Sequence, residues 1–189
     1  MYLFFDTETT GLPRNWQAPL EDLDNWPRLV QLAWLMVDEK GKEIKGVNKI
    51  IKPEGFIIPE EAASVHGIST ERALKEGVLL NPVLKEFKKG VDEAKIIVAH
   101  NISFDEMIMG AELLRKKHEH KLFDRPKICT MQSSTDYCKI ENEFGYKWPK
   151  LIELHHKLFD EGFDGAHDAL ADVKACARCF FELKKRGVI

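Results

Sequence analysis

The sequence predicts an α/β fold: a mixed sheet, made of a three-strand antiparallel meander plus parallel strands, with helices on both faces. Residues 2–53 contain three strand-like apolar runs and no helical pattern. After Pro53, short apolar runs alternate with segments of helical periodicity, which is the pattern of strands joined by helices. The chain has 189 residues, 44% of them hydrophobic and 31% charged. This is enough for a sizeable core, and we expect a single domain over residues 1–189.

Three segments predict the meander. YLFFD (2–6) is a short apolar strand, and LVQLAWLMVD (29–38) is a longer apolar run suited to the middle of a sheet. A turn at 39–42 leads to a return strand, EIKGVNKIIKP (43–53), which ends at a proline. The proline- and tryptophan-rich residues 13–28 form a loop that is too long for a simple connection, so we regard it as a candidate functional segment.

The remaining elements alternate between helix and strand. KIIVAH (95–100) is a short buried strand that leads directly into a helix with Phe104, Ile108 and Ala111 on one stripe. The final helix is expected over 168–186, ended by Gly187. The other predicted elements are helices at 58–67, 81–90, 130–138 and 149–159 and a strand at 125–130.

Composition and charge exclude several classes of protein. No apolar run approaches the roughly 20 residues that span a bilayer. The N-terminus lacks a basic lead-in and a small-residue cleavage site, so we expect no signal peptide and a cytoplasmic location. A sequence-independent duplex binder is usually strongly basic, whereas the net charge here is −3. Any contact with nucleic acid must therefore be local or assisted by metal ions.

The four cysteines allow two interpretations. Cys176 and Cys179 form a C-x-x-C pattern in a segment with helical character, where both side chains share a face. We expect all four to be buried free thiols, as is common for cysteine in a reducing compartment. The alternative is a zinc site completed by Cys129 and Cys138.

Four acidic residues leave apolar segments at positions that a fold could bring together. Asp6 and Glu8 lie two apart at the end of the first strand, so their side chains point to the same side and each raises the pKa of the other. Such a pair is either splayed apart in solvent or bridged by a cation. Asp105 lies one turn into its helix, where the helix dipole alone could favour it. Asp172 is flanked by Ala and Val in the last helix and needs a partner.

Three segments in order resemble the motifs of a known family. DTETTG near the N-terminus, AHNISFDEMIM in the middle and HDALADV near the C-terminus are similar to the three motifs of the DEDDh (DnaQ-like) 3′–5′ exonucleases. VHGIS (65–69) resembles a further segment that is common between the first and second motifs. The resemblance covers nearly the whole chain and implies a ribonuclease H-like fold.

The resemblance implies roles for particular residues. The family's metal-binding carboxylates fall on Asp6, Glu8, Asp105 and Asp172, which would hold two divalent cations, Mg²⁺ or Mn²⁺. The general base falls on His167, five residues before Asp172, where a tyrosine variant of the family has Y-x-x-x-D. A plain surface histidine at a helix start is the alternative. Asp168, four residues before Asp172, is expected to cap the helix rather than bind metal.

Substrate contacts should be local. The backbone of Thr9, Thr10 and Gly11 could hold the terminal nucleotide, because glycine permits close approach. Leu12 and Phe104 could stack on or wedge the last bases, or could belong to the core. Weaker candidates for contacts to the terminal nucleotide are His66 and Asn101. The basic run RKKHEHK (115–121) is either a phosphate track or, as we favour, a solvated helix end.

These observations favour a metal-dependent 3′–5′ exonuclease that acts on single-stranded DNA ends by a two-metal mechanism and releases nucleoside 5′-monophosphates. An RNA 3′ exonuclease is the alternative within the class, since only contacts to the 2′-hydroxyl would separate the two. A non-catalytic nucleic-acid or polymerase-binding module and a small-phosphoester hydrolase are alternatives from other classes. A proofreading role would require a DNA polymerase as partner.

Overall fold

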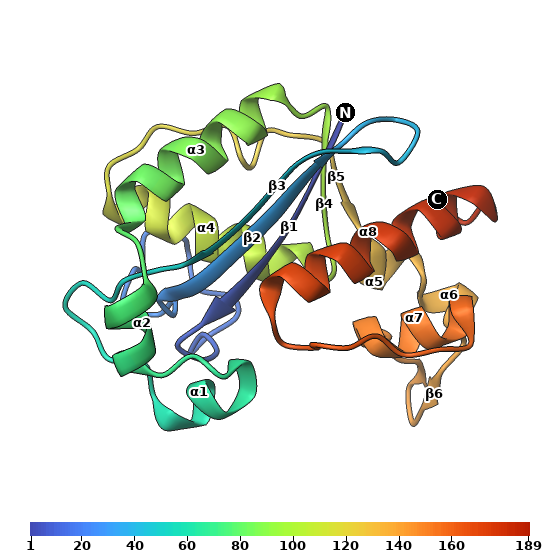
Figure 1. The fold of residues 1–189 in the computed structure, drawn as a ribbon. Helices are drawn as coiled ribbons and strands as arrows, with labels where there is room; N and C mark the ends of the chain where they lie inside the picture. The colour runs from blue at the N-terminus through green and yellow to red at the C-terminus, as the bar shows by residue number, and fades with distance from the viewer.

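A computed structural model describes residues 1–189 and shows a five-stranded sheet with the order β3-β2-β1-β4-β5 (Figure 1). β1, β2 and β3 are antiparallel neighbours, whereas β4 runs parallel to β1 and β5 parallel to β4. The strands are β1 (Tyr2–Thr9), β2 (Leu29–Val37), β3 (Glu43–Ile50), β4 (Ile96–Ala99) and β5 (Lys127–Cys129). The predicted meander with added parallel strands is therefore confirmed.

β1 is the central strand, and its alternating side chains enter two separate cores. Leu3 and Phe5 belong to the cluster on one face of the sheet, and Tyr2 and Phe4 to the cluster on the other. Because side chains alternate along a strand, Asp6 continues the face of Tyr2 and Phe4. The apolar part of β1 thus determines toward which helices the acidic end of the strand points.

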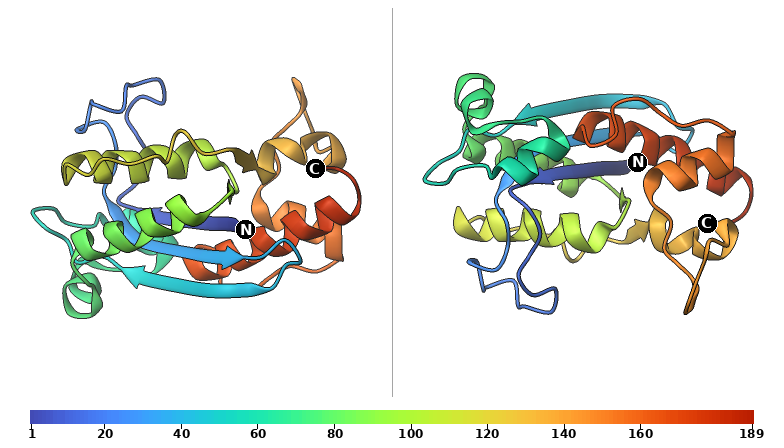
Figure 2. Two further views of the ribbon diagram at one scale, coloured as in Figure 1. Left: turned by 90° about the horizontal axis from the view of Figure 1, so that it is seen from above. Right: turned by 90° about the horizontal axis from the view of Figure 1, so that it is seen from below.

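Helices cover both faces of the sheet (Figure 2). α3 (Leu80–Glu93) and α4 (Ile102–Arg115) supply Phe87 and Ile108 to the first core. α8 (Ala169–Lys185) covers the second face, where the Phe180 ring lies 5.0 Å from that of Tyr2 and 5.2 Å from that of Phe4. No helix is both long and apolar enough to cross a membrane.

The shorter elements differ in part from the sequence-based expectation. The helix expected over 130–138 is interrupted at Ser134, whose hydroxyl donates to the carbonyl of Thr130 at 2.7 Å. α2 (Thr70–Glu76) was not predicted, nor was the hairpin of β6 (Glu141–Asn142) and β7 (Gly145–Tyr146), whose two-residue strands are too short to show a periodic pattern. The remaining elements are α1 (Glu60–His66), α5 (Thr130–Ser133), α6 (Thr135–Cys138) and α7 (Leu151–Phe159).

The four cysteines are free and buried. Burial raises the pKa of Cys179 to about 12 and that of Cys176 well above its usual value, so these thiols stay protonated. No group of three or more potential metal ligands includes a cysteine. The structure therefore supports buried thiols and not the zinc alternative.

Candidate metal centre

The candidate site lies at the C-terminal end of β1, where three elements contribute acidic side chains. β1 carries Asp6 and Glu8, the first turn of α4 carries Asp105, and the first turn of α8 carries Asp172. α4 and α8 lie on opposite faces of the sheet (Figure 2), so the acids approach the end of β1 from both sides.

Asp105 is held in place by the strand. Its Oδ1 accepts hydrogen bonds from the backbone N–H of Thr7 at 3.0 Å and from the Thr7 hydroxyl at 2.7 Å. Thr7 lies between the two acids of β1 and points to the other face of the strand. Asp105 is buried and bonded to β1, so it is not simply a solvated charge at a helix start.

The surroundings of Asp6 show that the acids converge. Burial raises the pKa of Asp6 well above its usual value, and the negative charges of its neighbours raise it further. The neighbours with this effect are, in decreasing order, Asp105, Asp172, Glu8 and Asp168. Residues from one end of the sequence to the other therefore share one electrostatic environment.

The other acids are perturbed in the same direction. Burial, with the charges of Asp172 and Asp105, raises the pKa of Glu8 to about 8. Burial raises the pKa of Asp105 to about 7 despite the opposing hydrogen bonds from Thr7. It also raises the pKa of Asp172 to about 6. Such a cluster favours uptake of protons or cations, and its oxygen donors suit hard divalent ions.

His167 lies at the rim of this cluster. One ligand atom each from Glu8, His167 and Asp172 lie within 4.8 Å of one another. The exposed His167 has a left-handed backbone (φ 68°), and its N–H donates to Asp172 Oδ2 at 2.9 Å. This bond ties the loop before α8 to the first turn of that helix. The arrangement can hold a cation or place an imidazole beside one.

Asp168 caps α8, as its position before the helix predicts. Its Oδ1 accepts from the backbone N–H groups of Leu170 and Ala171, both at 3.1 Å. Its Oδ2 accepts from Gln31 Nε2 at 3.0 Å, and the same Nε2 donates to Asn48 Oδ1 at 2.9 Å. This link from α8 to β2 and β3 was not predicted from the sequence. The only indication of it in the sequence is a glutamine, Gln31, within the apolar run 29–38.

The last residue of β1 and the turn after it carry four of the predicted substrate contacts. The Thr9 hydroxyl donates to the carbonyl of Gly11 at 2.7 Å, and Thr10 N–H donates to the carbonyl of Arg28 at 2.9 Å. Gly11 has φ 140°, which few other residues adopt. Leu12 is 72% exposed, so it does not belong to the core.

The other three substrate candidates, Phe104, His66 and Asn101, differ in their burial and in their contacts. Phe104 is partly buried against the core, and its ring centroid lies 5.7 Å from that of Trp16. His66 is buried at the end of α1; burial lowers its pKa, and the nearby His167 lowers it further. Asn101, the N-cap of α4, has a left-handed backbone and accepts a bond from Ser103, without a bond to the acidic cluster.

Glu112, for which the sequence predicted no role, anchors the loop 13–28. This buried carboxylate accepts from Arg28 Nε at 2.8 Å and from Leu29 N–H at 3.1 Å. It also lies 3.1 Å from Arg115, whose guanidinium donates to the carbonyls of Leu23 and Trp26. The first residue of the basic run 115–121 is thus used to fix the loop beside the candidate site.

A sequence model of the RNase_T exonuclease family matches residues 3–180. This chain belongs to that exonuclease family. Together with the structural comparisons below, this finding confirms the resemblance to the DEDDh (DnaQ-like) exonucleases and the ribonuclease H-like fold. A comparison with curated proteins gave no match.

Solved structures of exonuclease I share the fold of this exonuclease-family chain. The E. coli enzyme in complex with a dT13 oligonucleotide is 21% identical, with a TM-score of 0.78 over 98% of this chain and 41% of that chain. Its complex with a dA16 oligonucleotide is 21% identical, with a TM-score of 0.78 over 97% and 40%. The zinc ion bound form of its complex with single-stranded DNA is 20% identical, with a TM-score of 0.76 over 98% and 40%. The chain therefore spans about two fifths of the exonuclease I chains that it matches.

Proposed function

We propose that residues 1–189 act as one exonuclease domain that hydrolyses single-stranded DNA from its 3′ end and releases nucleoside 5′-monophosphates. The observation that carries this proposal is the acidic cluster at the end of β1, with His167 at its rim. The family supports the reaction class. The oligonucleotides bound to the exonuclease I structures favour single-stranded DNA as the substrate.

The donor set fits divalent cations. Asp6, Glu8, Asp105 and Asp172 offer carboxylate oxygens, the ligands that Mg²⁺ and Mn²⁺ prefer. Their raised pKa values reflect burial first, and then the negative charges of the neighbouring acids. We propose that these four acids hold two such ions. When bound, the ions would neutralise phosphate charge, lower the pKa of water and stabilise the leaving 3′ oxygen.

His167 is the proposed general base. Imidazole exchanges protons near neutral pH, so a histidine can accept the proton of an attacking water. His167 is exposed, on a loop and beside Glu8 and Asp172, so a ring nitrogen can reach a water in front of the cluster. The bond from its backbone N–H to Asp172 keeps the residue at that place.

The turn after β1 is the proposed holder of the terminal nucleotide. The hydrogen bonds of Thr9 and Thr10 fix the turn, and Gly11 leaves its backbone open to close approach. The exposed Leu12 and the partly buried Phe104 are the proposed contacts to the last bases, since stacking contributes about 1–3 kcal/mol per base whatever the sequence.

The proposal is tested with a 5′-labelled single-stranded oligonucleotide in the presence of Mg²⁺ or Mn²⁺. We expect His167→Ala to slow hydrolysis by about 10²- to 10⁴-fold, the usual contribution of a general base. The control is His156→Ala, an exposed histidine of α7, which should keep the wild-type rate. An unchanged rate in His167→Ala, or full activity in Asp6→Ala or in excess chelator, would contradict the proposal.

The preferred nucleic acid is decided by a separate comparison, in which the rates of hydrolysis are measured on DNA and RNA strands of matched sequence.

A further inference from the structure

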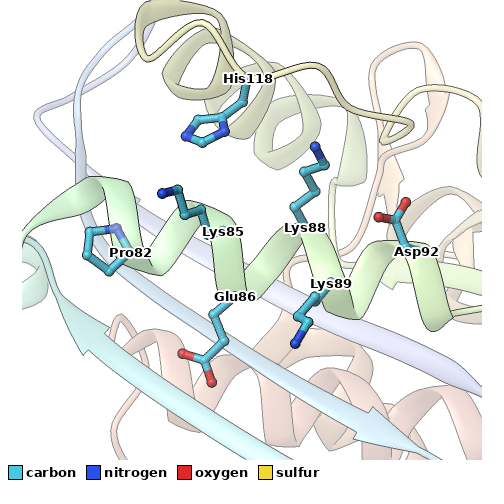
Figure 3. A pocket seen from close by; sticks show the side chains of 7 residues that line it. All are labelled: Pro82, Lys85, Glu86, Lys88, Lys89, Asp92 and His118. Carbon is cyan, nitrogen blue, oxygen red and sulfur yellow. The ribbon is translucent and has the colours of Figure 1, made fainter.

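A cavity of about 610 Å³ lies between α3 and the segment that follows α4 (Figure 3). Apart from Pro82, every residue that lines it is charged or a histidine. Figure 3 shows Lys85 and Lys88 extending from α3 toward His118. α3 packs on the face of the sheet opposite α8, and none of the residues that line the cavity belongs to the acidic cluster, so the two sites are separate.

The positive charges of this cavity are not neutralised by the protein. Lys85 and Lys88 form no ion pair. The two acids of the lining are already engaged: Glu86 pairs with Lys45 at 2.8 Å, and Asp92 lies 3.6 Å from Arg125. Lysines three apart on one helix repel each other, which weakens the helix slightly unless an anion is bound.

The opposite wall of the cavity is also fixed. His118 comes from the basic run 115–121, and its Nε2 hydrogen-bonds Asn81 Oδ1 at 2.6 Å. This bond connects the segment after α4 to the start of α3. Lys116 of the same run pairs with Glu54 at 2.9 Å and is not part of the cavity. The run thus contributes one wall, and α3 supplies the cations.

We propose that this cavity binds the phosphodiester backbone of a nucleic acid strand outside the site of hydrolysis. Lysine ammonium groups neutralise phosphates and release counterions. The lining contains no Phe, Tyr or Trp on which bases could stack, and lysines contact phosphates rather than base edges, so recognition should be independent of sequence. A local basic cavity also provides a nucleic-acid contact on a chain whose net charge is −3. The inference rests on the proposed function in taking the bound strand to be the substrate.

The test is the salt dependence of binding in the double variant Lys85→Gln/Lys88→Gln. Fluorescence anisotropy of a labelled single-stranded oligonucleotide is measured in chelator, so that no hydrolysis occurs, over a range of NaCl concentrations. Each lost phosphate contact lowers the slope of log K against log salt by about 0.7 for a single strand. We expect the variant to bind more weakly, with a slope smaller in magnitude by about 1.4.

The matched control is Lys42→Gln/Lys157→Gln, which changes the net charge equally at two exposed lysines that do not line the cavity. A slope that falls equally in both variants, or in neither, would overturn the proposal. The proposal would also be overturned if equimolar inorganic phosphate completely displaced the oligonucleotide from the lysines, because that result would indicate a small-anion site. If the protein binds the oligonucleotide through these lysines but hydrolyses no nucleic acid, only the proposed function is refuted. Hydrolysis without lysine-dependent binding would refute only this inference.

Discussion

At the scale of single residues, β1 uses both of its faces to build the site. Asp6 and Glu8 point to the side of α8, while Thr7 between them binds Asp105 of α4. The Thr7 hydroxyl favours the ionised form of Asp105, and burial opposes it. A neutral side chain therefore helps to decide whether an acid is ready to bind a cation.

Replacing Thr7 by Val keeps the shape of the side chain and removes one of the two bonds to Asp105. The pKa of Asp105 should rise further above about 7, because its charged form loses a donor. Loss of a residue that orients a metal ligand typically costs about 10- to 100-fold in metal affinity or activity. Calorimetric titration with Mn²⁺ measures the affinity. Thr7→Ser, which keeps the hydroxyl, is the control, and equal affinity in the two variants would contradict this role.

At the scale of elements, a buried ion network fixes the loop 13–28 against α4. Glu112 binds both Arg28 and Arg115, and Arg28 pairs through its backbone with Thr10 in the turn after β1. The guanidinium of Arg28 also lies over the Phe56 ring, 4.4 Å from its centroid. Arg28 thus connects the candidate nucleotide-binding turn, through its backbone, to the carboxylate of Glu112 on α4.

We expect Glu112→Gln to destabilise the protein by about 3–5 kcal/mol, because it leaves two partly buried guanidinium groups without their counter-charge. Thermal unfolding measures the effect, at about 2–4 °C per kcal/mol for a chain of this size. The exposed Glu119→Gln is the control and should unfold like the wild type. If both variants unfold at the same temperature, the network contributes no stability.

The sequence predicted the long elements well, because they bury whole faces and so show a clear period. β2 is buried along its full length, and α8 follows its helical pattern from the capping Asp168 onward. The convergence of the acids could be inferred only from the family motifs, since Thr7 and Asp105 are 98 residues apart. Local patterns carry no information on which distant side chains meet. Glu112 shows the same limit, because nothing in its segment distinguishes a buried acid from a solvated one.

At the scale of the whole molecule, the acidic cluster makes folding depend on pH. The pKa values of Glu8 and Asp105 are about 8 and about 7 in the folded state, above their ordinary values of 4.5 and 3.8. At pH values between the ordinary pKa and the folded-state pKa of each acid, the folded protein holds more protons than the unfolded chain. The free energy of unfolding therefore falls as pH rises. Without metal, stability should therefore decrease from about pH 4 to about pH 8.

Melting temperatures in chelator at pH 5 and pH 8 check this expectation, and we predict the lower value at pH 8. Asp105→Asn should show a smaller decrease, because its amide can still accept the bonds from Thr7 without a charge. Mg²⁺ at about 100 times its Kd should add about 2.7 kcal/mol, or about 5–10 °C, at pH 8. A melting temperature that responds to neither pH nor metal would mean that the acids do not share one site.

The buried thiols have a practical consequence for following the protein at work. Maleimide dyes react with thiolates, whereas the four native cysteines are shielded and at least Cys176 and Cys179 stay un-ionised. A single cysteine introduced on the surface would therefore take up a fluorophore alone, with every native thiol left in place. Energy transfer from that dye to a labelled oligonucleotide would then report the path of the strand across the molecule.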